Sequence, residues 1–573
     1  MNSKFICNIA HTQFDIVREV ATSVLDWKVS NNDREDWDVM WTDLSVPAET
    51  LSKMKSYQRI NHFPGMHLIS RKNFLATSLG KLRQQFPKDY GFFPRTWVFP
   101  SHSSELKQHL QQSKHKYMIV KPEKSCQGKG IFFTNRIEEL NPSQRYVVQN
   151  YIKSPYLIDG LKFDLRIYVL VSSCDPLRIY IYDEGLARFA TEPYSHPDIN
   201  NINNMFIHLT NYAVNKGNRA FINNKNIGSD NVGHKRSLRS LYKLLESQGH
   251  DVQGIKLKIE DIIIKTLCSI QPILKNCYLG VQKDDLTRAM CFEILGFDIL
   301  LDDKLKPHLI EVNHDPSFSV SSPLDKELKK NLIAGALKLS WVTKKNRIRY
   351  MKQVEDKCKN KGKLEKGKAQ SEYMKKAVKH YCELRGHEEK KYLGRYKRIY
   401  PIEGSEKYEK FIKASLIICK EWEDVRPGII TSIKKIPVTS RSPFSKNLST
   451  SNHRSKASLS VEVLETSISQ VPVQSLSKKK LNIPPYKKPK ELIAEPILPS
   501  QNLHSNQHSM QKSSKILSSF ISTKEHQLKM KLMPKLLRKT PQPPIKSSIS
   551  KSSSQVLSFI DTSTTCAKSS IAR

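Results

Sequence analysis

The sequence contains no long apolar run. Nowhere among its 573 residues do 18 apolar residues follow one another, which is about the length that a membrane-spanning helix requires. The first residues, MNSKFICNIAHTQFD, lack the apolar core of a signal peptide, and neither end of the chain carries a lipidation motif. We therefore expect a protein that neither crosses a membrane nor is anchored to one.

Paired cysteines and a P-loop are also missing. The ten cysteines form no C-x-x-C pair and show no regular spacing, so we expect reduced thiols in a cytosolic compartment. No stretch matches G-x-x-x-x-G-K-[ST], which excludes a Walker A nucleotide site. No internal repeat is evident, and a chain of this length has room for two to four domains.

Acidic residues are scarce relative to basic ones. The chain has 55 Asp and Glu against 94 Lys and Arg, which leaves a formal net charge of +39. An excess of this size indicates an acidic partner, which is nucleic acid, an anionic membrane or an acidic protein surface.

The most informative stretch is MCFEILGFDILLDDKLKPHLIEVNHDPSF, at residues 290–318. Two apolar segments, 291–301 and 308–312, flank a polar turn at residues 302–304. This pattern predicts a buried β-hairpin.

Three polar side chains interrupt that hairpin. Asp298 and Glu311 are expected to face each other across the two strands, and Asn313 shares the face of Glu311. Two carboxylates and a carboxamide on an apolar ribbon repel one another unless a cation lies between them. Oxygen ligands of this kind suit Mg²⁺ bridged to nucleotide phosphates. The alternative is that these side chains pair with lysine or arginine, or face water.

Residues 117–134 predict a second hairpin, which we call the flap. Residues 117–121 and 131–134 have strand character and flank the loop PEKSCQGKG. The backbone N–H groups of such a loop can close on phosphates, with Lys121 at its base as a point charge. A plain surface hairpin is the alternative.

Two further segments belong to this part of the chain. Residues 72–86 predict a helix, and on local evidence Lys72 at its start is solvated. Residues 145–152, RYVVQNYI, predict a strand that loses its apolar character at Gln149 and Asn150. Such a strand end can offer main-chain hydrogen bonds to a planar base.

A row of charged residues follows. Residues 161–173 and 177–191 both have strong strand patterns. Lys162, Asp164 and Arg166 alternate along the first strand and project from the same face. With Arg188 near the end of the second strand, they form a pocket with excess positive charge, suited to triphosphate and carboxylate ligands. A solvent-facing charged strand face is the alternative.

The C-terminal part is basic. Residues 256–274 and 322–339 predict helices. Residues 344–368 carry eleven basic residues against three acidic ones, and residues 371–397 continue with helical, basic character. We expect a pair of electrostatic docking helices here. The tyrosines among them are Tyr373, Tyr381, Tyr392 and Tyr396.

From about residue 426 the composition changes to Ser, Lys, Pro and Gln, with almost no glycine and few aromatic residues. This tail cannot bury enough apolar surface to offset the ordering of the chain, so we expect it to be disordered and basic.

The order of these parts is ATP-grasp-like, and the fold class expected is α/β (α+β). The sequence closely resembles the tubulin tyrosine ligase-like family, in particular its chain-elongating polyglutamylases. The resemblance covers roughly residues 1–340 and rests on the blocks NHFPGMHLISRK, FPRTW, KPEKSCQGKGI, the long block QNYIKSPYLIDGLKFDLRIYVLVSSCDPLRIYIYDEGLARFATEPY, HLTNYAVNK and CFEILGFDILLDDKLKPHLIEVNHDPSF. The division expected is 1–70 for an N-terminal α/β domain, 71–155 for a central domain with the flap, 156–340 for a C-terminal domain with the metal hairpin, 341–425 for a basic microtubule-binding region, and 426–573 for the tail.

The resemblance implies a role for each matching residue. In such proteins Arg166 and Arg188 bind the reacting carboxylates, and His314 matches a residue of elongating members; with Lys162 these are the expected catalytic residues. Asp298, Glu311 and Asn313 hold Mg²⁺. The residues that resemble the family's ATP contacts are Lys72, Lys121, Gln149, Tyr151, Ile152, Lys162, Asp164, Thr210 and Asn211.

The function implied is ATP- and Mg²⁺-dependent ligation of free L-glutamate to glutamates of acidic tubulin tails, through an acyl-phosphate. A glycine or tyrosine ligase of the same family, a non-catalytic microtubule-binding protein, and nucleic-acid binding through the basic tail are the alternatives. The resemblance also implies a monomer that localises to the cytoplasmic cytoskeleton, with cilia, axonemes or basal bodies as further localisations.

Overall fold

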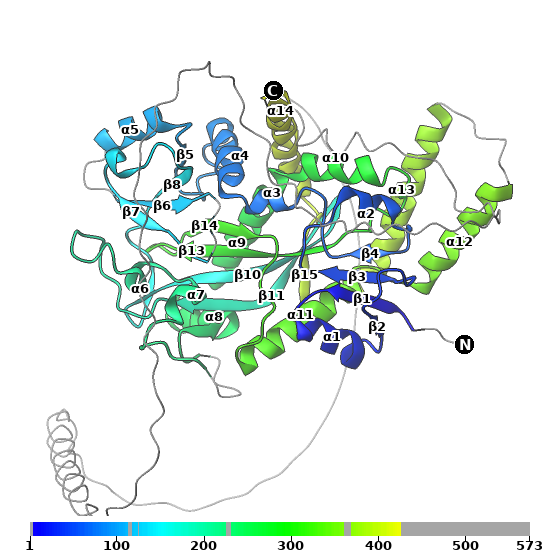
Figure 1. Ribbon diagram of the computed structural model, residues 1–573, viewed down its shortest axis with the longest axis horizontal. Coiled ribbons are helices and arrows are strands. Elements are labelled where there is room, and N and C mark those ends of the chain that lie inside the picture. The colour runs from blue at the N-terminus through cyan, green and yellow to red at the C-terminus, as the bar shows by residue number, and fades with distance from the viewer. Residues whose placement is uncertain are drawn as a thin grey trace, which may run out of the picture. The chain divides into compact units, whose positions relative to one another are not determined.

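The computed structural model describes residues 4–112, 117–123, 125, 127–224, 231–359 and 368–425. Within these residues the chain has a mixed α/β structure with three sheets, as Figure 1 shows. No helix in this described part combines the length and the apolarity that crossing a bilayer requires. The tail predicted from residue 426 onward lies outside the described residues.

The N-terminal sheet is parallel, with strand order β2-β1-β3-β4. Its strands are β1 (Ile6–His11), β2 (Lys28–Ser30), β3 (Val39–Thr42) and β4 (Arg59–Ile60). Its helices are α1 (Asp15–Glu19), the π-helix η1 (Val20–Val24) that continues α1, α2 (Ala48–Lys53) and α3 (His67–Ser70). Ile60 also pairs with Cys291, so β4 joins this sheet to the hairpin segment of the central sheet.

The flap belongs to a separate antiparallel sheet with strand order β5-β8-β6-β7. Its strands are β5 (Thr96–Phe99), β6 (Met118–Pro122), β7 (Phe132–Thr134) and β8 (Tyr146–Asn150). The helices beside it are α4 (Lys72–Gln85), α5 (Ser103–Gln112) and the 3₁₀ turn η2 (Ile137–Glu139). The pairing of β6 with β7 confirms the predicted hairpin, although Lys124 and Cys126 of its loop lie outside the described residues.

The central sheet is antiparallel, with strand order β12-β11-β10-β13-β14, and with β9 paired to β10 and β15 paired to β11. Its strands are β9 (Leu157–Ile158), β10 (Leu161–Cys174), β11 (Leu177–Phe189), β12 (Lys235–Ser237), β13 (Glu293–Leu301), β14 (Pro307–Asn313) and β15 (Tyr396–Tyr400). The remaining elements are α6 (Met205–His208), α7 (Tyr212–Asn215), α8 (Leu238–Ser247), α9 (Val252–Cys268), α10 (Gln271–Val281), α11 (Pro323–Leu339), α12 (Lys344–Lys359), α13 (Lys368–Glu389), η3 (Ser405–Tyr408) and α14 (Glu409–Val425).

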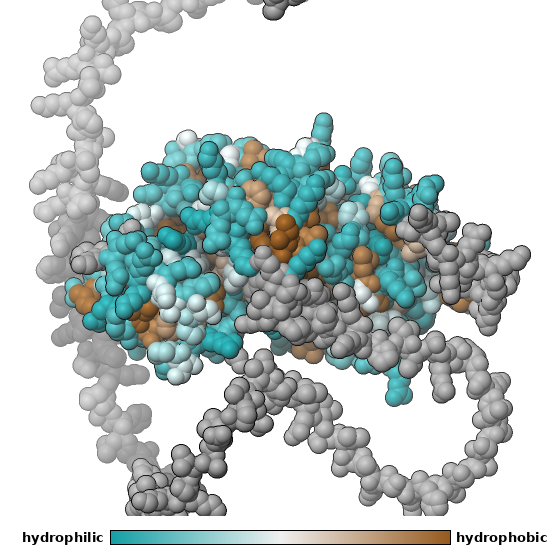
Figure 2. Space-filling model, turned by 90° about the horizontal axis from the view of Figure 1, so that it is seen from above, coloured by the Kyte–Doolittle hydropathy of each residue, from teal (hydrophilic) through white to brown (hydrophobic). Residues whose placement is uncertain are grey.

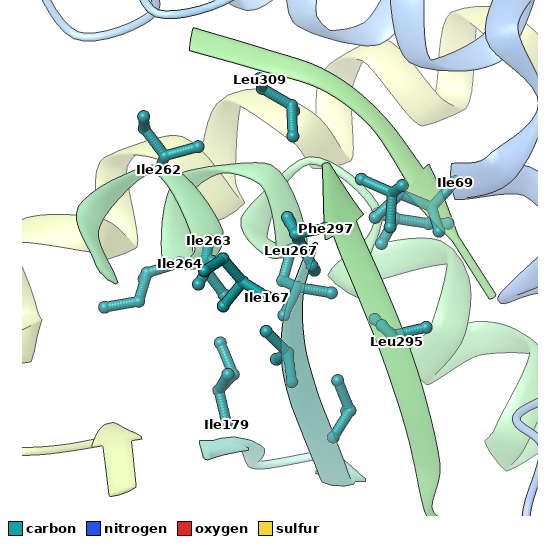
Figure 3. Packing of buried hydrophobic residues seen from close by; sticks show 14 of the residues in the cluster. Ile69, Ile167, Ile179, Ile262, Ile263, Ile264, Leu267, Leu295, Phe297 and Leu309 are labelled. Atoms are coloured by element: carbon teal, nitrogen blue, oxygen red, sulfur yellow. The ribbon is translucent and has the colours of Figure 1, made fainter. Parts of the chain in front are cut away.

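Each face of the central sheet has its own core. Ile167 of β10 and Phe297 of β13 point to one face, where they pack with Ile263 and Leu267 of α9 (Figure 3). Residues of the other parity, such as Leu170, pack with α11 and the N-terminal sheet. Because side chains alternate along a strand, the charged row of β10 lies on this second face. Most of the surface visible in Figure 2 is hydrophilic, as expected outside these cores.

Two predicted helices are wrong in part. The helix predicted at residues 256–274 breaks at Ser269, and α10 starts anew at Gln271 with Pro272 in its first turn, where the missing N–H of proline costs nothing. The helical prediction for residues 371–397 fails at its end, because Tyr396 belongs to strand β15 and lies opposite Tyr182 of β11. Tyr396 is buried in the core and is therefore not part of a docking surface.

Candidate active site

The predicted hairpin is present, and its two acids face each other. Asp298 of β13 pairs in register with Glu311 of β14, and Asn313 lies opposite Gly296. Asp302 stabilises the turn, since its Oδ1 accepts hydrogen bonds from the backbone N–H groups of Lys304 and Lys306. The hairpin prediction, including the Asp298–Glu311 pairing, is confirmed.

Arginines hold Asp298. Nε and Nη2 of Arg166 lie 2.6 and 3.2 Å from its carboxylate oxygens, and Nη2 of Arg188 lies 2.8 Å from Oδ2. Burial by itself would raise the pKa of Asp298, but the two guanidinium groups outweigh burial and hold this pKa well below its usual range. The alternative of pairing with arginine therefore applies to Asp298, which is ionised.

Glu311 is placed differently. It is half-buried, and its Oε1 lies 3.3 Å from Nδ2 of Asn313, which also lies 3.4 Å from Oδ2 of Asp298. Within the described residues Glu311 has no lysine or arginine within 4 Å. Burial and the neighbouring charge of Asp298 raise the pKa of Glu311. A cation or a proton between these carboxylates would relieve their repulsion.

The charged row lies where strand alternation predicts. Asp164 and Arg188 are opposite each other on β10 and β11, and Nε and Nη2 of Arg188 lie 2.7 and 2.6 Å from the Asp164 carboxylate. The Thr210 hydroxyl donates to the same carboxylate at 2.7 Å. The structure thus brings Asp164, Arg166, Arg188, Thr210 and Asp298 into one buried network.

Lys121 lies at the base of the flap and is buried. Its Nζ donates to Oε1 of Gln149 at 2.9 Å, and Nε2 of Gln149 donates to Thr96. Burial lowers the pKa of Lys121 to about 8, although the charge of Glu311 acts in the opposite direction. Lys121 and Gln149 are therefore brought together, and Thr96 is a neighbour that the sequence did not indicate.

Lys162 is the second buried lysine. Its Nζ donates to the backbone oxygen of His208 at 2.8 Å and to the Tyr151 hydroxyl at 3.0 Å. Burial lowers the pKa of Lys162 to about 7. His208 also contacts Tyr151 through Nδ1 at 3.1 Å. The HLTN motif was the available signal for His208, which is not among the predicted site residues.

The remaining predicted nucleotide contacts lie around the flap. Nζ of Lys72 donates to the backbone oxygen of Ser125 in the flap loop at 2.5 Å. A side chain at Gly128 would meet Oδ1 of Asn211 at 3.5 Å, so the same loop also lies against Asn211. Ile152 follows β8 and is half-buried.

His314 lies apart from this network. It follows Asn313, and its Nδ1 lies 3.7 Å from Oε1 of Glu293, while its ring meets that of His62 edge to face. Strand alternation places Glu293 on the opposite face of β13 from Asp298. The structure therefore brings His314 to a different cluster from the other predicted catalytic residues.

Comparison with known proteins gives consistent matches. Residues 50–349, which include every predicted site residue, match the tubulin-tyrosine ligase family. A probable beta-tubulin polyglutamylase of Tetrahymena thermophila is 48% identical over 407 residues, which are 70% of this chain and 34% of that protein. Tubulin polyglutamylase TTLL6 of Mus musculus is 43% identical over 414 residues, 72% of this chain and 49% of the relative. Tubulin polyglutamylase TTLL7 of Homo sapiens is 36% identical over 434 residues, with 71% and 48% covered. The chain thus spans about a third to a half of the length of these relatives.

Proposed function

Because the chain belongs to the tubulin-tyrosine ligase family, we propose that it is an ATP- and Mg²⁺-dependent tubulin polyglutamylase. It joins the amino group of free glutamate to glutamates, or to glutamate chains, on acidic tubulin tails. The three relatives are polyglutamylases by name, which favours glutamate over glycine or tyrosine as the added amino acid. The net charge of +39 complements an acidic tail.

The observation that carries the proposal is that Asp298 and Glu311 lie opposite each other on β13 and β14, with the buried Lys121 close enough for their charges to act on it. A cation between the two carboxylates would relieve their repulsion, and the available ligand atoms are oxygens, which suit Mg²⁺. The arginines use only part of the acceptor capacity of Asp298, since an ionised carboxylate has about four lone-pair sites. Asp298, Glu311 and Asn313 would hold Mg²⁺, which when bound neutralises charge on phosphate oxygens.

The lysines and arginines have separate tasks. Lys121 and Lys162 bring positive charge into a buried pocket, where it offsets the charge of a triphosphate. Arg166 and Arg188 use Nε and Nη2 for Asp298 and Asp164, and within the described residues Nη1 of neither has a hydrogen-bond partner. These Nη1 groups would bind the carboxylates of the acceptor glutamate and of the free glutamate, which otherwise repel each other, so that the amino group of the free glutamate can reach the acceptor carboxyl carbon.

The three-sheet arrangement supports an ATP-grasp-like core. In this proposal residues 71–155 form the domain whose flap sheet covers the nucleotide. Residues 156–340 form the domain whose central sheet supplies the residues that bind the metal and the substrate carboxylates. The nucleotide is surrounded by the other predicted ATP contacts, which are Lys72, Gln149, Tyr151, Ile152, Asp164, Thr210 and Asn211. The basic helices α12 and α13 then attract the microtubule through long-range charge.

The experiment offers radiolabelled glutamate, glycine or tyrosine with ATP to the wild-type chain, on intact and tail-trimmed microtubules. We expect label from glutamate alone, and only on intact microtubules. Glu311→Gln should abolish incorporation while co-sedimentation with microtubules persists. Asp302→Asn, at the turn of the same hairpin, is the matched control and should remain active.

Two outcomes would contradict the proposal. If Glu311→Gln still incorporated glutamate, Glu311 would not be a ligand of the catalytic Mg²⁺. If label from glycine or tyrosine were incorporated, the added amino acid would not be glutamate. A filter-binding comparison at near-physiological salt tests nucleic acid separately, and tighter binding to RNA than to microtubules would count against a tubulin substrate.

A further inference from the structure

A second cluster of ligand-type side chains lies outside the proposed nucleotide site. His62 follows β4, Glu293 begins β13, and His314 follows β14. The separation of five residues between Glu293 and Asp298, in a stretch of β13 paired to β10 without a register shift, places them on opposite faces. The cluster is therefore separate from the Asp298–Glu311 pair.

The spacing of its ligand atoms suits a metal ion. Oε1 of Glu293 lies 3.1 Å from Nδ1 of His62 and 3.7 Å from Nδ1 of His314, and one ligand atom of each residue lies within 4.8 Å of the others. Zinc bonds of about 2.0–2.1 Å at tetrahedral angles put neighbouring ligand atoms roughly 3.4 Å apart. The two measured separations bracket that value.

Hydrogen bonds to the backbone also orient the side chains of His62 and Glu293. Nε2 of His62 lies 2.9 Å from the backbone oxygen of Thr42, which can only accept, so Nε2 carries a proton and Nδ1 is available to a metal. The backbone N–H of Phe63 donates to Oε2 of Glu293 at 2.8 Å, which directs Oε1 to the two histidines. A second hydrogen bond of this kind is the usual support of a metal-binding histidine.

Charge and exposure favour a cation. Asp315 and Asp43 add negative charge near Glu293 and His62, while Arg71 is the opposing charge near His314. The side chains of His62 and Glu293 are 6% and 2% exposed, whereas that of His314 is 24% exposed. Solvent thus reaches the cluster at His314, where a fourth ligand is needed.

We propose that His62, Glu293 and His314 bind a divalent transition metal, Zn²⁺ in particular, with a water molecule as the fourth ligand. Two imidazole nitrogens and one carboxylate oxygen are a donor set that suits zinc over Mg²⁺. The bound ion ties the segment after β4 to the ends of β13 and β14 and fixes the ring of His314. The competing arrangement without metal is an ion pair between protonated His62 and Glu293.

The test uses the full chain, freed of metal by a chelator and titrated with Zn²⁺ against a competing zinc indicator in excess Mg²⁺ and without ATP or tubulin. We expect one tight site in the wild type that weakens at least about tenfold in His314→Ala and in Glu293→Gln. His308→Ala, which removes a half-buried histidine of β14 that lies outside the cluster, should keep the site. Co²⁺ in the same site should give the intense visible bands of tetrahedral coordination.

Thermal unfolding supplies an independent readout. Zn²⁺ should raise the Tm of the wild type and of His308→Ala by more than it raises that of His314→Ala. Equal zinc affinity and an equal Tm shift in the wild type and His314→Ala would overturn the proposal and leave the ion pair as the role of the cluster. His314 is partly exposed, so this variant decides the question even if Glu293→Gln does not fold. Since no substrate is present, the result does not depend on glutamate ligation.

Discussion

Arg166 and Asp298 lie directly opposite each other on β10 and β13, and Nε of the arginine is 2.6 Å from Oδ1 of the aspartate. Nη2 reaches the second oxygen at 3.2 Å, so the contact is bidentate. The Asp298 side chain is 2% exposed. An ionised carboxylate at this depth requires a cationic partner, and Arg166 and Arg188 share that task.

Arg166→Ala should therefore destabilise the fold as well as weaken ligation. The variant leaves a buried carboxylate with Arg188 alone, and breaking a buried pair on one side costs about 3–5 kcal/mol. Urea unfolding of the full chain measures the loss. The control is Arg136→Ala, whose pair with Glu139 is largely exposed and should change stability by less than about 1 kcal/mol. Equal losses in the two variants would contradict a supporting role for Arg166.

The hairpin and the charged row could be predicted from the sequence because both follow from local patterns. Asp298 and Glu311 interrupt an apolar ribbon at positions that a short turn brings together. Lys162, Asp164 and Arg166 alternate within one strand. Period-two alternation decides the face of every residue without reference to the rest of the chain.

The partners of those residues could not be predicted. The contact of Arg166 with Asp298 depends on the register of two strands that are more than a hundred positions apart in sequence. Lys162 donates to the backbone oxygen of His208 at the end of α6, a contact that no side-chain pattern indicates. The roles implied by the family resemblance, including that of Ile152, stay predictions.

Gly185 should tolerate no side chain. A Cβ at this position of β11 would lie 2.3 Å from the backbone oxygen of Arg166, which cannot move without displacing the charged row. We expect Gly185→Ala to lose more than about 2 kcal/mol of stability and to lose activity with it. Gly80→Ala is the matched control, because Gly80 lies within α4 with open space at its Cβ. That substitution should stabilise the protein by about 0.5–1 kcal/mol, and a similar sign for both variants in urea unfolding would contradict the close approach.

The lowered pKa of Lys162 predicts how the affinity for ATP changes with pH. Its pKa of about 7 in the folded chain is below the ordinary value, so the side chain is protonated below pH 7 and becomes neutral above it. Phosphates bind the protonated form, and KM for ATP should rise between pH 7 and 9 by up to about tenfold per pH unit. Arginine stays charged throughout this range.

The Lys162→Arg variant should accordingly remove the part of the rise in KM that begins near pH 7 and leave the part due to Lys121, whose pKa is about 8. Lys162→Met should weaken ATP binding most below pH 7, where the wild-type lysine is protonated. A wild-type profile in Lys162→Arg would assign the titration to another group. The lowered pKa of Lys162 also determines whether its contribution to stability rises or falls with pH. Between pH 7 and the ordinary pKa of lysine the unfolded chain binds more protons, so the contribution of Lys162 to the free energy of unfolding rises with pH over that window.

Helix α12 offers the last prediction, which concerns the proposed microtubule contact. Its described residues expose Lys345 and Lys352 beside Ile348 and Met351, a combination of charge and apolar surface without a partner in the described chain. Reversing both charges in Lys345→Glu/Lys352→Glu should weaken co-sedimentation with microtubules about tenfold at low ionic strength. The difference should shrink as salt is added, because exposed charges are screened over about 10 Å at 0.1 M.

The control for α12 is Lys107→Glu/Lys258→Glu, which makes the same change in net charge at exposed positions of α5 and α9. If net charge alone attracted the chain to microtubules, both double variants would bind equally weakly. A deficit confined to the α12 variant locates the contact on this helix, since short-range pairing with acidic groups depends on where a charge lies. Equal binding of both variants and the wild type would instead remove α12 from the interface.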